Sequence, residues 1–106
     1  MVFSGPTLTH PSSGGTALRE REEIRALLLE HRPDLDRRML VGPSGALTIP
    51  LSAGRSIEIG RMRRRGSARW VVATPSADGA ALREPTSLRA VARTALSVLE
   101  EIEARR

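Results

Sequence analysis

The chain has 106 residues and a formal net charge of +5, with 40% hydrophobic and 27% charged residues. This length fits one small domain, and the hydrophobic fraction is that of a folded chain rather than a disordered one. The sequence contains neither cysteine nor lysine, which excludes disulfides, thiolate chemistry, Cys-type zinc sites and the usual lysine-containing phosphate loop.

Residues 1–15 are rich in glycine, serine, threonine and proline, which predicts a flexible tail ahead of a single domain over residues 16–106. The segment has no basic cluster followed by an apolar run, so it does not have the pattern of a signal peptide. No stretch approaches the roughly 20 apolar residues that span a bilayer. We therefore expect a cytoplasmic protein that does not enter the membrane.

A first helix is predicted over residues 16–32, with Thr16 as its N-cap and Pro33 ending it. Its apolar stripe recurs near the helical period and consists of Leu18, Ile24, Leu27, Leu28 and His31. A short further turn within residues 34–41 would place Leu35, Met39 and Leu40 inward, before the break at residues 42–45.

Three short strands with tight turns follow, which predicts an antiparallel meander over residues 46–51, 56–63 and 68–74. Pro50 has no N–H to donate, which favours a strand end or an edge. In the second strand, the face that carries Ile57 and Ile59 continues into arginine. The third strand is apolar on both faces, which indicates an interior strand or a covered second face.

A last helix is predicted from a cap at Thr86 or Ser87 to about Glu103. Its wide apolar stripe consists of Leu88, Val91, Ala92, Ala95, Val98, Leu99 and Ile102. The expected fold is therefore an α+β two-layer sandwich, a helix, a three-stranded antiparallel meander and a helix, with both helices on one sheet face. Part of the stripe has heptad-like spacing, and because a small aliphatic core is marginal, we also expect a homodimer.

Positive charge is concentrated in one part of the chain. Residues 37–70 hold eight arginines against a single acid, Glu58, whereas residues 16–36 hold four arginines against six acids and residues 71–106 hold five of each. The excess centres on one predicted hairpin, which carries the candidate binding residues Arg61, Arg63, Arg64, Arg65 and Arg69. Such a local field attracts phosphate or an acidic protein surface.

The hypothesis that follows is a small, non-enzymatic DNA-binding or regulatory protein that contacts phosphates through this basic hairpin. The sequence has no asparagine or glutamine, the side chains that most often read adenine, so sequence-tolerant binding is favoured. The alternative is an adaptor or chaperone that docks an acidic protein partner. A solvated hairpin in an arginine-coding, GC-rich genome would give the same cluster without any binding role.

No catalytic residue, metal ligand or cofactor is predicted. Asp34 and Asp36 are spaced as a loop or capping pair rather than as an acid and base on one helix face. A single His31 supports no catalytic triad, and Glu58 is expected to pair across the sheet with an arginine. Trp70 lies between arginine and valine and is interpreted as a core residue rather than a base-stacking platform.

Overall fold

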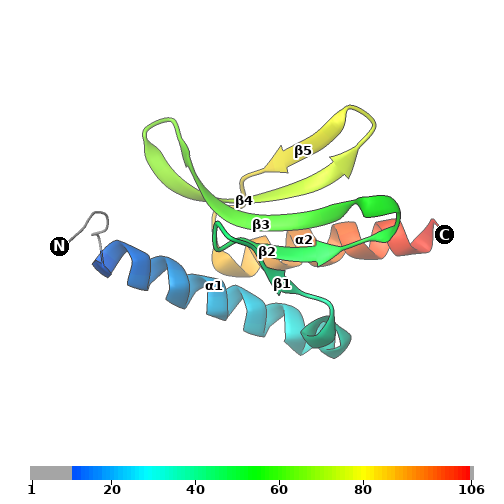
Figure 1. Cartoon of the computed structure of the whole chain (residues 1–106), viewed down its shortest axis with the longest axis horizontal. Coiled ribbons are helices and arrows are strands. Elements are labelled where there is room, and N and C mark those ends of the chain that lie inside the picture. The colour runs from blue at the N-terminus through cyan, green and yellow to red at the C-terminus, as the bar shows by residue number, and fades with distance from the viewer. Residues whose placement is uncertain (1–10, 106) are drawn as a thin grey trace.

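The computed structural model describes the backbone of residues 11–105 and the side chains of residues 16–105 (Figure 1). Within these residues, two α-helices precede and follow a run of strands and two short 3-10 helices along the chain. In chain order the elements are α1 (Pro11–His31), η2 (Pro33–Arg37), β1 (Leu40–Val41), β2 (Leu47–Pro50), η3 (Ser52–Gly54), β3 (Ser56–Arg64), β4 (Ser67–Ser76), β5 (Gly79–Arg83) and α2 (Leu88–Ala104).

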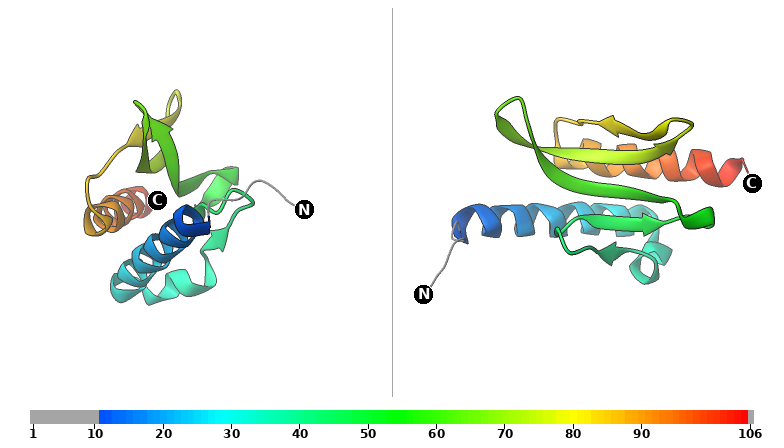
Figure 2. Two further views of the ribbon diagram at one scale, coloured as in Figure 1. Left: turned by 90° about the vertical axis from the view of Figure 1, so that its left-hand side faces the viewer. Right: turned by 45° about the horizontal axis from the view of Figure 1, so that its top comes forward.

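The strands form one antiparallel sheet in the order β1-β2-β3-β4-β5, with both helices on the same side of it (Figure 2). The predicted α+β class is confirmed, and the three predicted strands correspond to β2, β3 and β4. The three-stranded meander is corrected to five strands. β1 has only two residues and β5 reads Gly-Ala-Ala-Leu-Arg, so neither carries the β-branched alternation that identifies a strand in sequence.

The end of α1 agrees with the prediction, but its start does not. α1 begins at Pro11, not at Thr16, so residues 11–15 belong to the helix. The rest of the predicted tail, residues 1–10, lies outside the described residues. α1 ends at His31, and Pro33 opens η2, as predicted. Ser87 caps α2, since its side chain accepts a hydrogen bond from the Ala90 N–H at 3.0 Å.

The core is aliphatic and lies between the sheet and the two helices. The sheet contributes Leu47, Ile49, Ile57, Ile59 and Val72; α1 contributes Ile24 and Leu28; and α2 contributes Val91, Ala92, Ala95, Leu96, Val98 and Leu99. Most of the α2 stripe is therefore used within one chain to cover the sheet, rather than left free for a second copy. No helix in the described part of the chain is long and apolar enough to cross a membrane.

The turn predicted after α1 is present, with one correction. Leu35 in η2 is fully buried and Met39 packs against the core, as predicted. Leu40 was expected inward but is 59% exposed. The reason is that Leu40 belongs to the edge strand β1, opposite Thr48, on the face of the sheet that the helices do not cover. Leu18, near the start of α1, is also exposed, because α1 packs through its later turns.

An ion-pair network joins the ends of the two helices. Arg32 contacts Asp34 at 2.9 Å and Glu103 of α2 at 2.9 Å, and Arg38 contacts both carboxylates at 3.3 Å. The hydrogen bonds from Arg32 lower the pKa of Asp34 to about 2 and also lower the pKa of Glu103. Asp34 and Asp36 were predicted to be a loop or capping pair; instead they lie within η2, without a side-chain capping hydrogen bond, and both form ion pairs: Asp34 holds this network and Asp36 pairs with Arg25.

This network predicts a defined acid sensitivity. Because the pKa of Asp34 falls from its usual 3.8 to about 2 on folding, its contribution to stability is complete above about pH 4 and is lost as the pH falls towards 2. We expect Arg32→Gln to lower the melting temperature at pH 6 and to have a clearly smaller effect near pH 2, where about half of the Asp34 carboxyl is protonated in the folded state. Thermal unfolding of both proteins between pH 2 and 7 measures the difference, and a constant gap across that range would contradict the assignment.

Candidate functional site

The hairpin that joins β3 to β4 curls away from the two helices (Figure 1). Arg64 pairs with Ser67 across its end, so Arg65 and Gly66 form a two-residue turn. Both have positive φ, +53° and +85° respectively, as a type I′ turn requires. An arginine in the left-handed region costs roughly 1–2 kcal/mol, because its Cβ crowds the following carbonyl. The turn therefore presents a guanidinium at a position where glycine or asparagine is the ordinary choice.

Arg61 is held by partners at the base of the hairpin, although the residue is still exposed. Its guanidinium donates to Glu20 Oε1 at 2.6 Å and lies 5.9 Å from the centre of the Trp70 ring. The Trp70 Nε1–H donates to the same Glu20 oxygen at 2.8 Å. One carboxylate of α1 therefore joins the helix to both strands of the hairpin. Arg61 has a structural partner that neutralises its charge.

Arg64 is also paired with an acid. Its Nε and a terminal nitrogen contact Glu84 Oε2 at 2.9 and 2.8 Å. Glu84 follows β5, so this contact ties the hairpin to the connection that leads into α2. Two of the five predicted site residues, Arg61 and Arg64, thus hold the hairpin in place.

The other three arginines have no acidic partner among the described residues. Arg63 donates to the Gly66 carbonyl at 3.0 Å, within the turn, while Arg65 and Arg69 make no hydrogen bond or ion pair with any residue that the structure describes. All three are exposed, and none has a carboxylate partner among residues 16–105. Arg63, Arg65 and Arg69 form what we call the tip triad. The hairpin brings these side chains to one end of the molecule.

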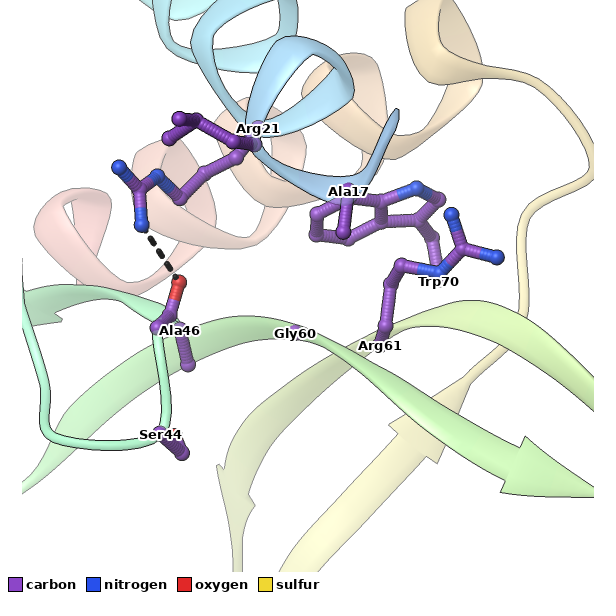
Figure 3. A pocket seen from close by; sticks show the side chains of 9 residues that line it. Ala17, Arg21, Ser44, Ala46, Gly60, Arg61 and Trp70 are labelled. Carbon is purple, nitrogen blue, oxygen red and sulfur yellow. Dashed lines mark hydrogen bonds between the residues drawn. The ribbon is translucent and has the colours of Figure 1, made fainter. Parts of the chain in front are cut away.

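Two shallow pockets flank Trp70 at the base of the hairpin. The first, of about 310 Å³, lies between the start of α1 and the sheet (Figure 3) and is lined by Ala17, Leu18, Arg21, Ser44, Gly45, Ala46, Gly60, Arg61 and Trp70. Its two guanidiniums are engaged: Arg21 donates to the Gly45 carbonyl at 3.4 Å, and Arg61 binds Glu20. The second, of about 320 Å³, lies between the hairpin and the start of α2. Of the tip triad, Arg69 lines the second pocket, whereas Arg63 and Arg65 line neither pocket.

Of the other predictions from sequence, the one for Trp70 is confirmed and those for Glu58 and His31 are wrong. Trp70 packs against the core, as predicted. The pairing of Glu58 with an arginine is wrong, because the register places Thr48 and Ala73 opposite it and its carboxylate accepts from Ser56 at 3.4 Å. His31 is exposed, with Nδ1 3.3 Å from the Leu27 carbonyl oxygen, rather than part of a buried stripe. Among the described residues no group of three or more His, Asp or Glu side chains is placed to hold a metal ion.

Sequence reasoning missed the two acids that divide the arginine cluster. Glu20 and Glu84 lie 41 and 20 residues from their arginine partners along the chain. Charge counting over segments assigns Glu20 to the first helix and Glu84 to the last third of the chain, so neither was set against the hairpin. Comparisons with protein-family models, with curated proteins and with solved structures find no significant match to this chain.

Proposed function

We propose that the chain is a small, non-enzymatic, cytoplasmic regulatory protein that binds nucleic acid phosphates through its β3–β4 hairpin. The observation that carries the proposal is the tip triad: Arg63, Arg65 and Arg69 are exposed at one projecting hairpin with no acidic partner among the described residues. A basic two-stranded ribbon can lie along a groove or follow a phosphate backbone. Each neutralised phosphate releases counterions, and this release drives association.

The strained Arg65–Gly66 turn also supports phosphate binding at the hairpin. Residues held in left-handed backbone conformations cluster at functional positions, where the side chain they present compensates for the cost. Arg65 has φ of +53° in the turn of the hairpin, where it is exposed and next to Gly66. A glycine there would relieve the backbone but would remove the central charge of the triad.

The mode of binding follows from the side chains on the hairpin. The tip offers guanidiniums and backbone groups, and Trp70 is bound to Glu20 rather than free to stack on a base. Guanidiniums reach phosphate in any sequence, so affinity should depend weakly on base sequence and steeply on salt. The proposed partner is therefore duplex DNA of mixed sequence.

Fluorescence anisotropy of a labelled random 20-base-pair duplex tests the proposal, with the protein titrated at low and at moderate salt. We expect saturable binding that weakens steeply as salt rises, with a slope set by about three phosphate contacts. Absence of binding at low salt would overturn the proposal. Binding to heparin without binding to the duplex would favour the alternative, an acidic protein partner on the same face.

Glu20 should restrain binding by neutralising Arg61. Replacing Glu20 with glutamine keeps an oxygen that accepts from Trp70 but removes the charge that pairs with Arg61. We expect duplex affinity to rise several-fold and the salt slope to steepen by about 0.9, the value for one added phosphate contact. Trp70→Phe is the matched control, since it removes the hydrogen bond to Glu20 and leaves the ion pair. Equal behaviour of the two variants would argue against a role for the Arg61 charge.

A further inference from the structure

A pocket of about 370 Å³ lies between the last turns of α2 and the sheet. Arg55, in its lining, directly precedes β3, whereas the tip triad surrounds the turn at the other end of that strand (Figure 1). We call it the far pocket, because the length of β3 separates it from the tip triad. The apolar part of its lining is buried or half-buried and consists of Leu51, Pro75, Val98 and Ile102.

Three arginines from three separate segments line the far pocket. Arg55 comes from the connection between β2 and β3, Arg83 from β5, and Arg105 from the residue after α2. Arg83 lies opposite Val72, a core residue, so its side chain leaves β5 on the face that the helices cover. These residues are far apart in the sequence, so the fold, and not a run of arginine codons, brings their charges together.

The chain itself does not neutralise these arginines. Arg55 and Arg83 make no ion pair or side-chain hydrogen bond within the described part of the chain. Arg105 has one acidic neighbour, Glu101, at 4.0 Å, and because both side chains are largely exposed this ion pair is weak. Three guanidiniums against one carboxylate leave the pocket lining with an excess of two positive charges.

We propose that the far pocket binds a small organic phosphate monoester with an aliphatic body. A phosphate monoester carries close to two negative charges at pH 7, which matches the excess on the lining. Guanidiniums suit this group because their planar N–H pairs fit two phosphate oxygens. The hydroxyls of Ser52 and Ser76 also line the pocket, and neither has a hydrogen-bond partner among the described residues. They supply further donors to the phosphate.

The rest of the lining determines the body of the ligand. Val98 and Ile102 offer aliphatic carbon, and no aromatic side chain of the described residues lines the pocket, so a nucleobase would have nothing on which to stack. The volume is in the lower part of the range of small-molecule sites. A short aliphatic phosphate therefore fits the far pocket better than a nucleotide does.

n-Butyl phosphate is a probe with this chemistry, and calorimetric titration at low salt measures its binding. We expect one saturable site with a dissociation constant below about 1 mM. Inorganic phosphate, which has no carbon to place against Val98 and Ile102, should bind about tenfold more weakly. Absence of saturable binding of butyl phosphate, or equally tight binding of inorganic phosphate, would overturn the proposal.

Replacing arginine with methionine keeps an aliphatic stem and removes the charge and the donors. We expect Arg83→Met and Arg55→Met each to weaken butyl phosphate binding about tenfold. Arg93→Met is the matched control, because Arg93 is exposed, has no ion-pair partner among the described residues and lies outside the far pocket. Equal weakening in all three variants would mean that net charge alone attracts the probe, and the proposed site would be wrong.

Two neighbouring acids give a test of the opposite sign. Glu101 lines the far pocket, whereas Glu100 lines a groove on another side of α2, together with His31 and Arg93. Glu101→Gln should tighten butyl phosphate binding several-fold, because it removes a carboxylate from the lining and releases Arg105. Glu100→Gln changes the net charge equally and should leave the dissociation constant within about twofold of the parent. Equal tightening by both variants would count against the site.

The proposed ligand does not depend on the proposed nucleic acid binding. The variant with alanine at Arg63, Arg65 and Arg69 should bind butyl phosphate as the parent does, because none of the three lines the far pocket. A failed duplex titration would therefore leave this result intact. If Arg83→Met instead weakened duplex binding and left butyl phosphate binding unchanged, the far pocket would belong to a nucleic acid surface and the proposal would be overturned.

Discussion

Replacing Arg63, Arg65 and Arg69 together with alanine is expected to lower duplex affinity on the order of a hundredfold at low salt. Each guanidinium that contacts a phosphate contributes about 0.9 to the slope of log affinity against log salt, so losing three should flatten that slope by about 2.7. The fold should survive, because these side chains make no ion pair with a described residue and only Arg63 donates a hydrogen bond, to Gly66. Anisotropy across a salt series measures affinity and slope together.

The matched control removes the same charge elsewhere. Arg37, Arg55 and Arg93 are exposed, lie away from the hairpin and have no ion-pair partner among the described residues. Changing these three to alanine lowers the net charge from +5 to the same value as the triad variant. We expect the control to lose only the weak, diffuse attraction that net charge provides. If both triple variants weaken binding equally, overall charge rather than the hairpin accounts for it.

A triple change that included Arg64 would be a poorer test. Arg64 contacts Glu84 at 2.8 Å, and its removal would leave that half-buried carboxylate without its partner. A loss of binding could then come either from the loss of a phosphate contact or from movement of the hairpin. The structure separates the two effects, because it distinguishes the arginines that hold the hairpin from those at its tip.

The sequence predicted the parts of the fold that have strong periodicity. Ile57 and Ile59 alternate with polar residues, and the apolar stripe of α2 recurs at three and four residues, so β3 and α2 were found with nearly their observed bounds. β1 and β5 were missed because two or five residues without β-branched alternation carry no such signal. These strands form by pairing with β2 and β4, a tertiary effect that local propensity does not contain.

The sequence predicted which hairpin carries the candidate site, but not which of its arginines pair with acids. The count of arginines around Gly66 identified the hairpin, because neighbours in sequence stay neighbours in a two-residue turn. Pairing between Glu20 and Arg61, or between Glu84 and Arg64, depends on where α1 and the β5–α2 connection pack. Such pairings follow from the three-dimensional fold, so the sequence alone could not tell which arginines have an acidic partner and which have none.

The register of the sheet can be tested by two adjacent residues of β3 that face opposite ways. Ile59 is fully buried, pairs with Leu47 and Val72 across its neighbouring strands, and faces both helices. Ile59→Ala should cost about 3 kcal/mol, because it removes buried methyl groups and leaves a cavity that an aliphatic core fills only in part. Glu58→Ala, on the uncovered face, should change stability by less than about 0.5 kcal/mol.

Urea unfolding followed by circular dichroism measures both changes. A domain of this size has a total stability of about 5–15 kcal/mol, so the Ile59 variant should stay folded at room temperature while its melting temperature falls by about 15 °C. Because a shift of one residue in pairing moves every side chain of a strand to the other face, the two variants respond oppositely to a register error. A larger loss for Glu58→Ala than for Ile59→Ala would mean that β3 presents its other face to the helices.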